Sequence, residues 1–195
     1  MVSNSDFVVS SVRKGIDMDL KGSKTEANLQ TAFAGESQAR NKYSFFEKQA
    51  LKEGYMQIAG IFNETANNEM AHAKIWYKTL NGPIKDTIEN LVLAAAGEHY
   101  EWTEMYKGFA EVAKEEGFND IAFKFEMVGH IEKEHEARYN ELHKRMKEGT
   151  TFKRDEVTTW HCRNCGHLHV GDSAPEKCPV CGDPQTEFEL LARNY

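Results

Sequence analysis

Four cysteines, arranged as two short pairs, have the clearest metal-binding chemistry in this sequence. They form two Cys-x-x-Cys-Gly motifs, and twelve residues separate the pairs. The glycine after each pair permits the tight turn that aims backbone N–H groups at thiolate sulfur. Four thiolates make a closed tetrahedral site for iron or zinc, and the spacing alone does not choose between these metals. Crowded pairs favour a metal site over disulfides, and the predicted ligands are Cys162, Cys165, Cys178 and Cys181.

A second set of residues consists of glutamates and histidines at helical spacing. Glu69 and His72 form one Glu-x-x-His pair, and Glu132 and His135 form another. Residues three apart lie on one face of a helix, so each pair can bind one ion. A single pair is weak evidence because helices are rich in glutamate. Two such pairs, together with one glutamate from each of two other helices, match the arrangement of a di-metal carboxylate site. These ligands suit iron or manganese better than zinc.

Each of the four predicted helices carries a glutamate among the apolar residues of its core stripe. An ionised carboxylate in a core costs several kcal/mol unless it is paired or bound to a metal. The alternative is that the helical phase is misread and the four core-stripe glutamates are solvated. Solvation is the simplest interpretation of six other glutamates: Glu47, Glu64, Glu104, Glu115, Glu134 and Glu136. The four on the core stripes are Glu36, Glu69, Glu98 and Glu132.

Spacing along the chain places these groups at one level of a bundle. Glu36 precedes Gly54, and Glu98 precedes Gly117, by intervals that differ in length by a single residue. The two Glu-x-x-His pairs follow those glycines at identical distances along the chain. Antiparallel helices with arms of similar length, at ~1.5 Å per residue, return to the same height. Glu101 adds a further carboxylate one helical turn after Glu98.

Glycine and proline divide the chain into a long helical region and a loop-rich tail. Within residues 23–148 the single proline is Pro83, and the other three prolines all follow Ala174. Ser23 and Glu26 are spaced as a helix-capping box, and a glycine lies near each expected helix end. A faint repeat relates the first helix pair to the second. The four expected helices cover about residues 23–53, 55–80, 86–117 and 119–148.

Composition restricts the possible partners. The net charge is -7, and no block of lysine or arginine marks a nucleic-acid surface. No apolar run reaches the roughly 20 residues that span a bilayer, and the apolar patch at residues 7–9 is too short for a signal peptide. A cytoplasmic protein with no nucleic-acid or membrane partner is expected. The expected organisation is an N-terminal extension at 1–18, a helical domain at 19–148, a linker at 149–156 and a metal domain at 157–195.

Several of these motifs occur together in one known family. They are Ala34-Gly35-Glu36-Ser37-Gln38-Ala39-Arg40, Glu69-x-x-His72, Gly97-Glu98-His99-Tyr100-Glu101 and Glu132-x-x-His135, followed by the cysteine pairs. From about residue 19 to the C-terminus the chain resembles the rubrerythrin family. The resemblance implies a mainly α fold, in which an antiparallel, ferritin-like four-helix bundle precedes a small rubredoxin-like metal domain. The surroundings of the cysteines, including Trp160 and Phe188, resemble that small domain and favour iron over zinc.

The resemblance also implies ligand roles. Glu69 and Glu132 would bridge two iron ions, while Glu101 and His72 would be alternative ligands of an iron that changes position with redox state. Tyr43 and Tyr106 resemble the family's tyrosines that hydrogen-bond ligand carboxylates, although a tyrosine on a core stripe is also ordinary packing. The implied ligands of the two irons are Glu36, Glu69, His72, Glu98, Glu101, Glu132 and His135, and the four cysteines would bind a third iron.

The implied activity is reduction of hydrogen peroxide to water by a non-haem di-iron peroxidase that protects against oxidative stress. Electrons would pass through the tetracysteine iron from an NAD(P)H-linked reductase or a rubredoxin, because the chain has no Gly-x-Gly-x-x-Gly motif of its own. The resemblance implies a homo-oligomer, at least a head-to-tail dimer. Two alternatives stay open: an iron-handling ferroxidase, and a non-enzymatic zinc-ribbon interaction protein.

Overall fold

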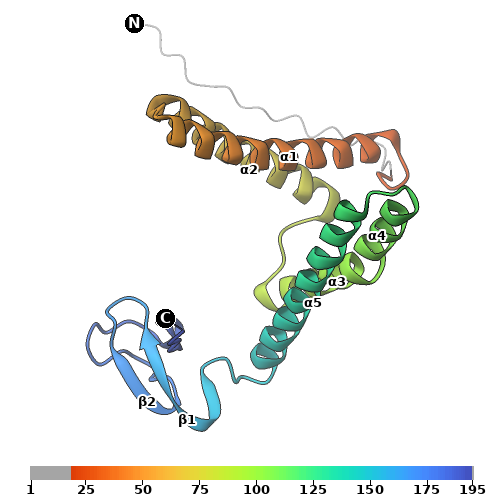
Figure 1. Ribbon diagram of the computed structural model, residues 1–195. Helices are drawn as coiled ribbons and strands as arrows, with labels where there is room; N and C mark the ends of the chain where they lie inside the picture. Colours follow the sequence, from red (N-terminus) through yellow and green to blue (C-terminus); the bar gives the residue numbers. More distant parts are fainter. Residues whose placement is uncertain (1–18, 195) are drawn as a thin grey trace, which may run out of the picture. The chain divides into compact units, whose positions relative to one another are not determined.

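The computed structural model describes residues 19–194, which divide into two units between Ile84 and Lys85. The first unit is a helical hairpin, and the second is a helical hairpin followed by a small sheet (Figure 1). The extension expected at residues 1–18 lies outside the described residues. Among those described, no helix is both long enough and apolar enough to cross a membrane. The expected fold class, mainly α with a small C-terminal metal domain, is confirmed.

The first hairpin consists of α1 (Lys24–Glu53) and α2 (Met56–Asn81). The predicted cap is present, because Oγ of Ser23 accepts a hydrogen bond from the backbone N–H of Glu26 at 3.1 Å. The Glu26 carboxylate in turn accepts the N–H of Gly22. Gly54 ends α1 with φ of 85°, a left-handed conformation that glycine adopts without the steric penalty of a side chain. These local signals explain why the expected limits of both helices agree closely with the observed ones.

The second hairpin contains α3 (Thr87–Tyr100), the π-helical turn η1 (Glu101–Met105), α4 (Tyr106–Glu115) and α5 (Asn119–Lys147). Asp86 caps α3 by accepting the backbone N–H of Glu89 at 2.9 Å. Gly117, with φ of 85°, makes the turn into α5 and repeats the role of Gly54. The matching glycine turns confirm that the two helix pairs are built alike.

The π-helical turn is the one feature of the helices that the expected limits miss. A single uninterrupted helix was expected here, but the backbone N–H of Tyr106 bonds the carbonyl of Glu101 five residues earlier. Tyr43 precedes Gly54 by the same number of residues as Tyr106 precedes Gly117. The interval from Glu98 to Gly117, however, is one residue longer than the interval from Glu36 to Gly54. The second hairpin therefore has one extra residue between Glu98 and Tyr106, and the wider π-turn accommodates it.

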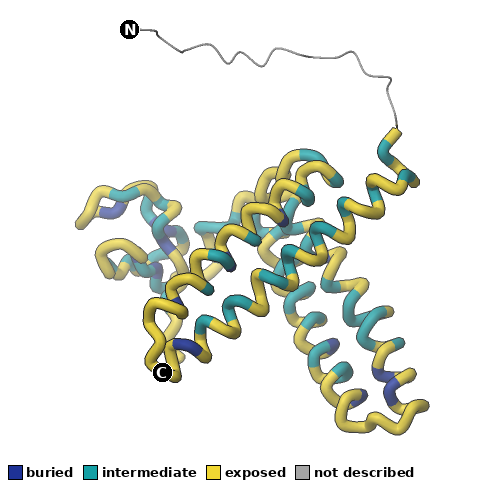
Figure 2. Tube along the Cα trace, turned by 90° about the horizontal axis from the view of Figure 1, so that it is seen from above, coloured by how far each residue is buried: buried dark blue, intermediate teal, exposed yellow. Residues whose placement is uncertain are grey.

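Small residues line the contacts between the helices of each hairpin. The buried helical positions are Ala50, Ala59, Ala66, Ala73, Ala95, Ala110, Ala113, Ala122 and Gly129. Figure 2 colours these positions dark blue, while teal and yellow cover most of the remaining helical surface. Large apolar side chains such as Phe46, Ile58 and Phe109 are exposed. A hairpin of two helices is too small to bury side chains of this kind by itself.

The tail forms a three-stranded antiparallel sheet in the order β2-β1-β3. Its strands are β1 (Lys153–Cys162), β2 (Leu168–Ser173) and β3 (Phe188–Leu190), and a 3₁₀ turn, η2 (Gln185–Glu187), precedes β3. β1 begins inside the segment expected to be a linker. The hydrophobic core of this small domain consists of Trp160, Cys162, Ala174, Cys178 and Phe188. Two of the four cysteines are thus part of the hydrophobic core of this small domain.

Gly54→Ala should lower the melting temperature, and Gly60→Ala should not. A methyl group at φ of 85° destabilises the fold by about 1–2 kcal/mol. For a chain of this size, that loss lowers the melting temperature by about 2–8 °C. Gly60 is an exposed position inside α2, where a Cβ would meet nothing within 4 Å. Alanine there should stabilise by about 0.5–1 kcal/mol. Thermal unfolding followed by circular dichroism checks both; equal effects of the two variants would contradict the turn analysis.

Candidate metal centres

The first hairpin brings together three predicted ligands, Glu36, Glu69 and His72. One ligand atom of each lies within 4.8 Å of the others. Nδ1 of His72 lies 2.9 Å from Oε2 of Glu69 and 3.8 Å from Oε1 of Glu36. The Glu69 side chain is only 16% exposed. The i, i+3 spacing on α2 thus places an imidazole and a carboxylate side by side, facing a carboxylate from α1.

The second hairpin repeats this arrangement with Glu98, Glu132 and His135. Their ligand atoms also lie within 4.8 Å of one another. Nδ1 of His135 lies 2.6 Å from Oε2 of Glu132 and 3.9 Å from Oε1 of Glu98. Each hairpin therefore holds a group of two carboxylates and one imidazole, a donor set that fits an iron ion.

Electrostatics in the second hairpin show why this group suits a cation. Burial raises the pKa of Glu98, and the negative charges of Glu132 and Glu101 raise it further. Burial also raises the pKa of Tyr106, with further contributions from the carboxylates of Glu101, Glu132 and Glu98. The additional predicted ligand, Glu101, is therefore close enough to act on the group electrostatically. A cation among these carboxylates would convert mutual repulsion into attraction.

The two predicted partner tyrosines occupy matching places in the hairpins. Tyr43 packs against Phe46 and Phe62, with ring centroids 6.2 and 6.3 Å away. Tyr106 packs in the same way against Phe109 and Phe125, at 6.4 and 6.1 Å. Both rings thus belong to aromatic clusters, as the packing interpretation requires. Hydrogen bonds from these tyrosines to ligand carboxylates stay a prediction.

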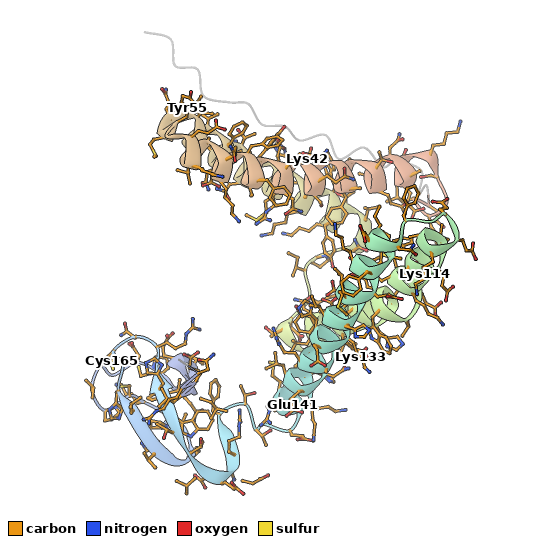
Figure 3. The ribbon with its side chains drawn as sticks, viewed as in Figure 1. Lys42, Tyr55, Lys114, Lys133, Glu141 and Cys165 are labelled. Atoms are coloured by element: carbon orange, nitrogen blue, oxygen red, sulfur yellow. The ribbon has the colours of Figure 1, made fainter. Side chains whose placement is uncertain are left out.

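The tail brings the four cysteines together as predicted. Their sulfur atoms all lie within 4.8 Å of one another. The Cys162–Cys181 and Cys165–Cys178 sulfur separations are 3.8 and 3.6 Å, far beyond a disulfide bond of about 2.05 Å and suited to a shared metal ion. Cys165, labelled in Figure 3, lies in the loop between β1 and β2. The surrounding histidines are not members of this group.

Backbone geometry prepares the cysteine motifs for metal. Gly166 and Gly182, with φ of 79° and 82°, follow the two pairs and close the turns. Burial opposes ionisation of Cys178, but hydrogen bonds from the backbone N–H groups of Cys181 and Val180, together with those from the Cys181 and Cys165 thiols, outweigh it and lower the pKa of the thiol to about 6. The pKa values of Cys165 and Cys181 are raised, so Cys178 is the thiol that ionises most readily among these three. Such hydrogen bonds stabilise thiolate, the form that binds metal. The four thiols therefore fit a tetrahedral iron site.

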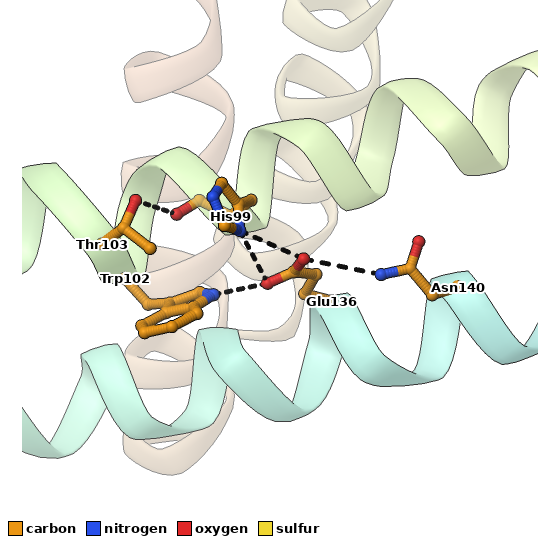
Figure 4. A network of polar contacts seen from close by, with 5 residues as sticks. All are labelled: His99, Trp102, Thr103, Glu136 and Asn140. Carbon is orange, nitrogen blue, oxygen red and sulfur yellow. Dashed lines mark hydrogen bonds and ion pairs between the residues drawn. The ribbon is translucent and has the colours of Figure 1, made fainter.

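One polar network near the second group was not predicted. The Glu136 carboxylate accepts a hydrogen bond from Nε1 of Trp102 at 2.5 Å and lies 3.1 Å from Nδ1 of His99 (Figure 4). The bond from Trp102 and the contact with His99 outweigh partial burial and lower the pKa of Glu136. The expectation that Glu136 is a solvated charge is wrong, since its side chain is only 20% exposed. The periodicity of the core stripes does not reveal this network, because the partners of Glu136 are a histidine and a tryptophan from another helical segment.

Comparisons with known proteins agree with this geometry. The Rubrerythrin family model matches residues 27–143, and the model for the Rubrerythrin, rubredoxin-like domain matches residues 160–189. The chain is 49% identical to Rubrerythrin of Nitratidesulfovibrio vulgaris, over 90% of this chain and 98% of that protein. It is 48% identical to Rubrerythrin-1 of Clostridium acetobutylicum, over the same shares of each chain. It is 47% identical to Rubrerythrin of Porphyromonas gingivalis, over 95% of this chain and all of that protein.

A solved structure of nigerythrin in a partially reduced state covers 97% of this chain and 100% of its own, at 29% identity. Its TM-score is only 0.34, so the family assignment depends on the sequence matches. Those matches, together with the two Glu–His groups and the four cysteines, identify the cofactors as two iron ions and one tetracysteine iron ion, as predicted. The chain belongs to the rubrerythrin family.

Proposed function

We propose that this protein reduces hydrogen peroxide to water: one peroxide, two electrons and two protons yield two water molecules as the O–O bond breaks. The observation that carries the proposal is the presence, in one chain, of two matching Glu–His groups and a four-thiol site. Iron bound by the Glu–His groups would supply the two electrons, and iron in the thiol site would replace them one at a time. The setting we propose is protection against oxidative stress in a cytoplasm.

The proposed ligand roles follow the two repeats. Glu69 and Glu132, the less exposed carboxylates of the two groups, would bridge the irons. Glu36 would bind the first iron and Glu98 the second, and His135 would be the imidazole ligand of the second iron. His72 and Glu101 would be alternative ligands of the first iron. The His72 side chain is 51% exposed, and we propose that it releases and regains a ligand position.

Tyr106 is proposed to hold the substrate or a ligand carboxylate by donating a hydrogen bond. Because burial and three nearby carboxylates raise its pKa above the usual range, the phenol keeps its proton at neutral pH. A protonated hydroxyl is a donor, and a donor stabilises negative charge that develops on oxygen. We assign Tyr43 the same role in the first hairpin because the aromatic packing of the two residues matches.

Electrons are proposed to enter through the small domain. Cys165 and Cys181 are exposed, while Cys162 and Cys178 are buried, so one edge of the thiol site is open to a donor. We propose that an NAD(P)H-linked reductase or a rubredoxin is this donor. We also propose at least a head-to-tail dimer, in which the thiol site of one subunit serves the Glu–His groups of its partner.

Rapid mixing of reduced protein with peroxide tests the proposed activity. One equivalent of hydrogen peroxide, added without oxygen, should restore the visible absorption of the ferric thiol site much faster than dissolved oxygen does. Glu101→Ala should slow this by at least about tenfold, because the reactive site loses one charged ligand. Glu104→Ala, which removes a neighbouring exposed carboxylate, is the matched control and should leave the rate unchanged. An unchanged rate in Glu101→Ala, or zinc in the thiol site, would overturn the mechanism.

Cys165→Ser should separate the two metal functions. Removing one of four thiolates should abolish the red colour and one iron per chain, while the Glu–His groups keep their iron. Peroxide should then oxidise the reduced protein for a single turnover, and steady turnover with an external donor should fall by at least about tenfold. His167→Gln, beside the site but outside the ligand group, is the control. Full steady turnover in Cys165→Ser would show that electrons reach the Glu–His groups by another route.

A further inference from the structure

The π-helical turn that begins at Glu101 is held by a polar clasp from α5. Glu136 contacts both Trp102, at 2.5 Å, and His99, at 3.1 Å. The amide of Asn140 lies 3.5 Å from the same carboxylate, and Oγ1 of Thr103 donates to the backbone carbonyl of His99 at 2.6 Å. Figure 4 shows these side chains gathered around Glu136 and the turn. We call Glu136, Trp102 and His99 the clasp.

The clasp runs beside the candidate metal site. Each member directly follows a residue of that site: His99 follows Glu98, Trp102 follows Glu101 and Glu136 follows His135. Successive residues of a helix point in directions that differ by about 100°. Fixing the direction of one residue therefore fixes the direction of its neighbour. A clasp on three such neighbours sets how the turn is rotated relative to α5.

The clasp is present in the hairpin with the π-turn and is missing from the other. His72 and His135 occupy equivalent places, so the residue equivalent to Glu136 is Ala73, which has no acceptor. The first hairpin has an uninterrupted α1 over Lys24–Glu53, and the second has the extra residue and the extra carboxylate Glu101. The acceptor Glu136, the inserted residue and the additional ligand candidate Glu101 thus all occur in the same hairpin.

A π-turn needs such support. Its i→i+5 hydrogen bonds replace the regular i→i+4 bonds. Such turns are rare, occur mostly as single turns inside α-helices, and are frequent at functional sites. A hydrogen bond to a charged group is among the stronger stabilising contacts in a protein. The ring of Trp102 is also held from another side, since Nζ of Lys133 lies 5.4 Å from its centroid.

We propose that Glu136 is a positioning residue: by holding Trp102 and His99, its carboxylate fixes the π-turn and keeps Glu101 close to the group of Glu98 and Glu132. The inference rests on the proposed function only in that Glu101 is taken to bind iron. Glu136 itself is assigned no contact with metal or peroxide. Its effect on the reaction passes through the conformation of residues 101–105.

Hydrogen–deuterium exchange on the full chain, with and without iron, tests the clasp directly. Glu136→Ala should speed exchange of the amides at residues 99–106 by about ten- to a hundredfold, the range expected for a lost hydrogen bond to a charged group. Trp102→Phe, which keeps a ring and removes the N–H donor, should give a similar local increase. Glu136→Gln can still accept one bond and should be intermediate. Glu134→Ala, an exposed carboxylate on the same helix, is the control.

A double-mutant cycle then asks whether the clasp acts through Glu101. Glu136→Ala should slow peroxide oxidation by about tenfold in the wild-type background and add no further loss to Glu101→Ala. Unchanged exchange at residues 99–106, or an equal increase along all of α3 and α5, would overturn the proposal, because the carboxylate would then be inert or merely structural. Additive losses in the cycle would also overturn it. If the wild-type protein does not reduce peroxide, the proposed function fails, and the exchange result in iron-free protein still decides whether the clasp holds the turn.

Discussion

The mutual repulsion of carboxylates gathered on apolar helix faces is the constraint on which the rest of this structure depends. In each hairpin, two carboxylates and one imidazole have ligand atoms within 4.8 Å of one another. In the second hairpin, burial and neighbouring negative charge raise the pKa of Glu98. Such groups destabilise a fold unless a cation balances them. The ordinary devices of helical hairpins, caps at Ser23 and Asp86 and glycine turns at Gly54 and Gly117, therefore position a metal site that the helices alone would disfavour.

The two hairpins are similar, and their differences are chemically informative. Both place a glutamate opposite a Glu-x-x-His pair, and both pack a tyrosine against two phenylalanines. The second hairpin alone adds a residue, a π-turn, Glu101 and the acceptor Glu136. A symmetric pair of hairpins would give each iron the same surroundings. Under the proposed ligand roles, the additional carboxylate Glu101 would give one iron a choice of partners when its charge changes.

Most of the fold and of the metal groups could be predicted from sequence because their signals are local. Capping at Ser23, the glycine turns and the i, i+3 spacing of Glu132 and His135 each depend on a few adjacent residues. The π-turn could not be found from a regular helical period. Its signal was the single-residue difference between the two hairpins in the interval from the first glutamate ligand to the turn glycine. Glu136 was missed because its partners lie 34 and 37 residues earlier, so their contact depends on how two helices pack.

Thermal unfolding with and without ferrous iron, compared between wild type and Glu98→Gln, tests the central claim most directly. Because folding raises the pKa of Glu98 above its ordinary value of 4.5, ionisation of this group destabilises the iron-free fold as the pH rises through its raised pKa. At pH 7, iron-free Glu98→Gln should therefore melt at or above the wild-type temperature and gain less from ferrous iron. This advantage should vanish below about pH 4, where both proteins are uncharged at this position. A variant that melts below wild type without iron, yet keeps the whole iron-dependent gain, would contradict the account.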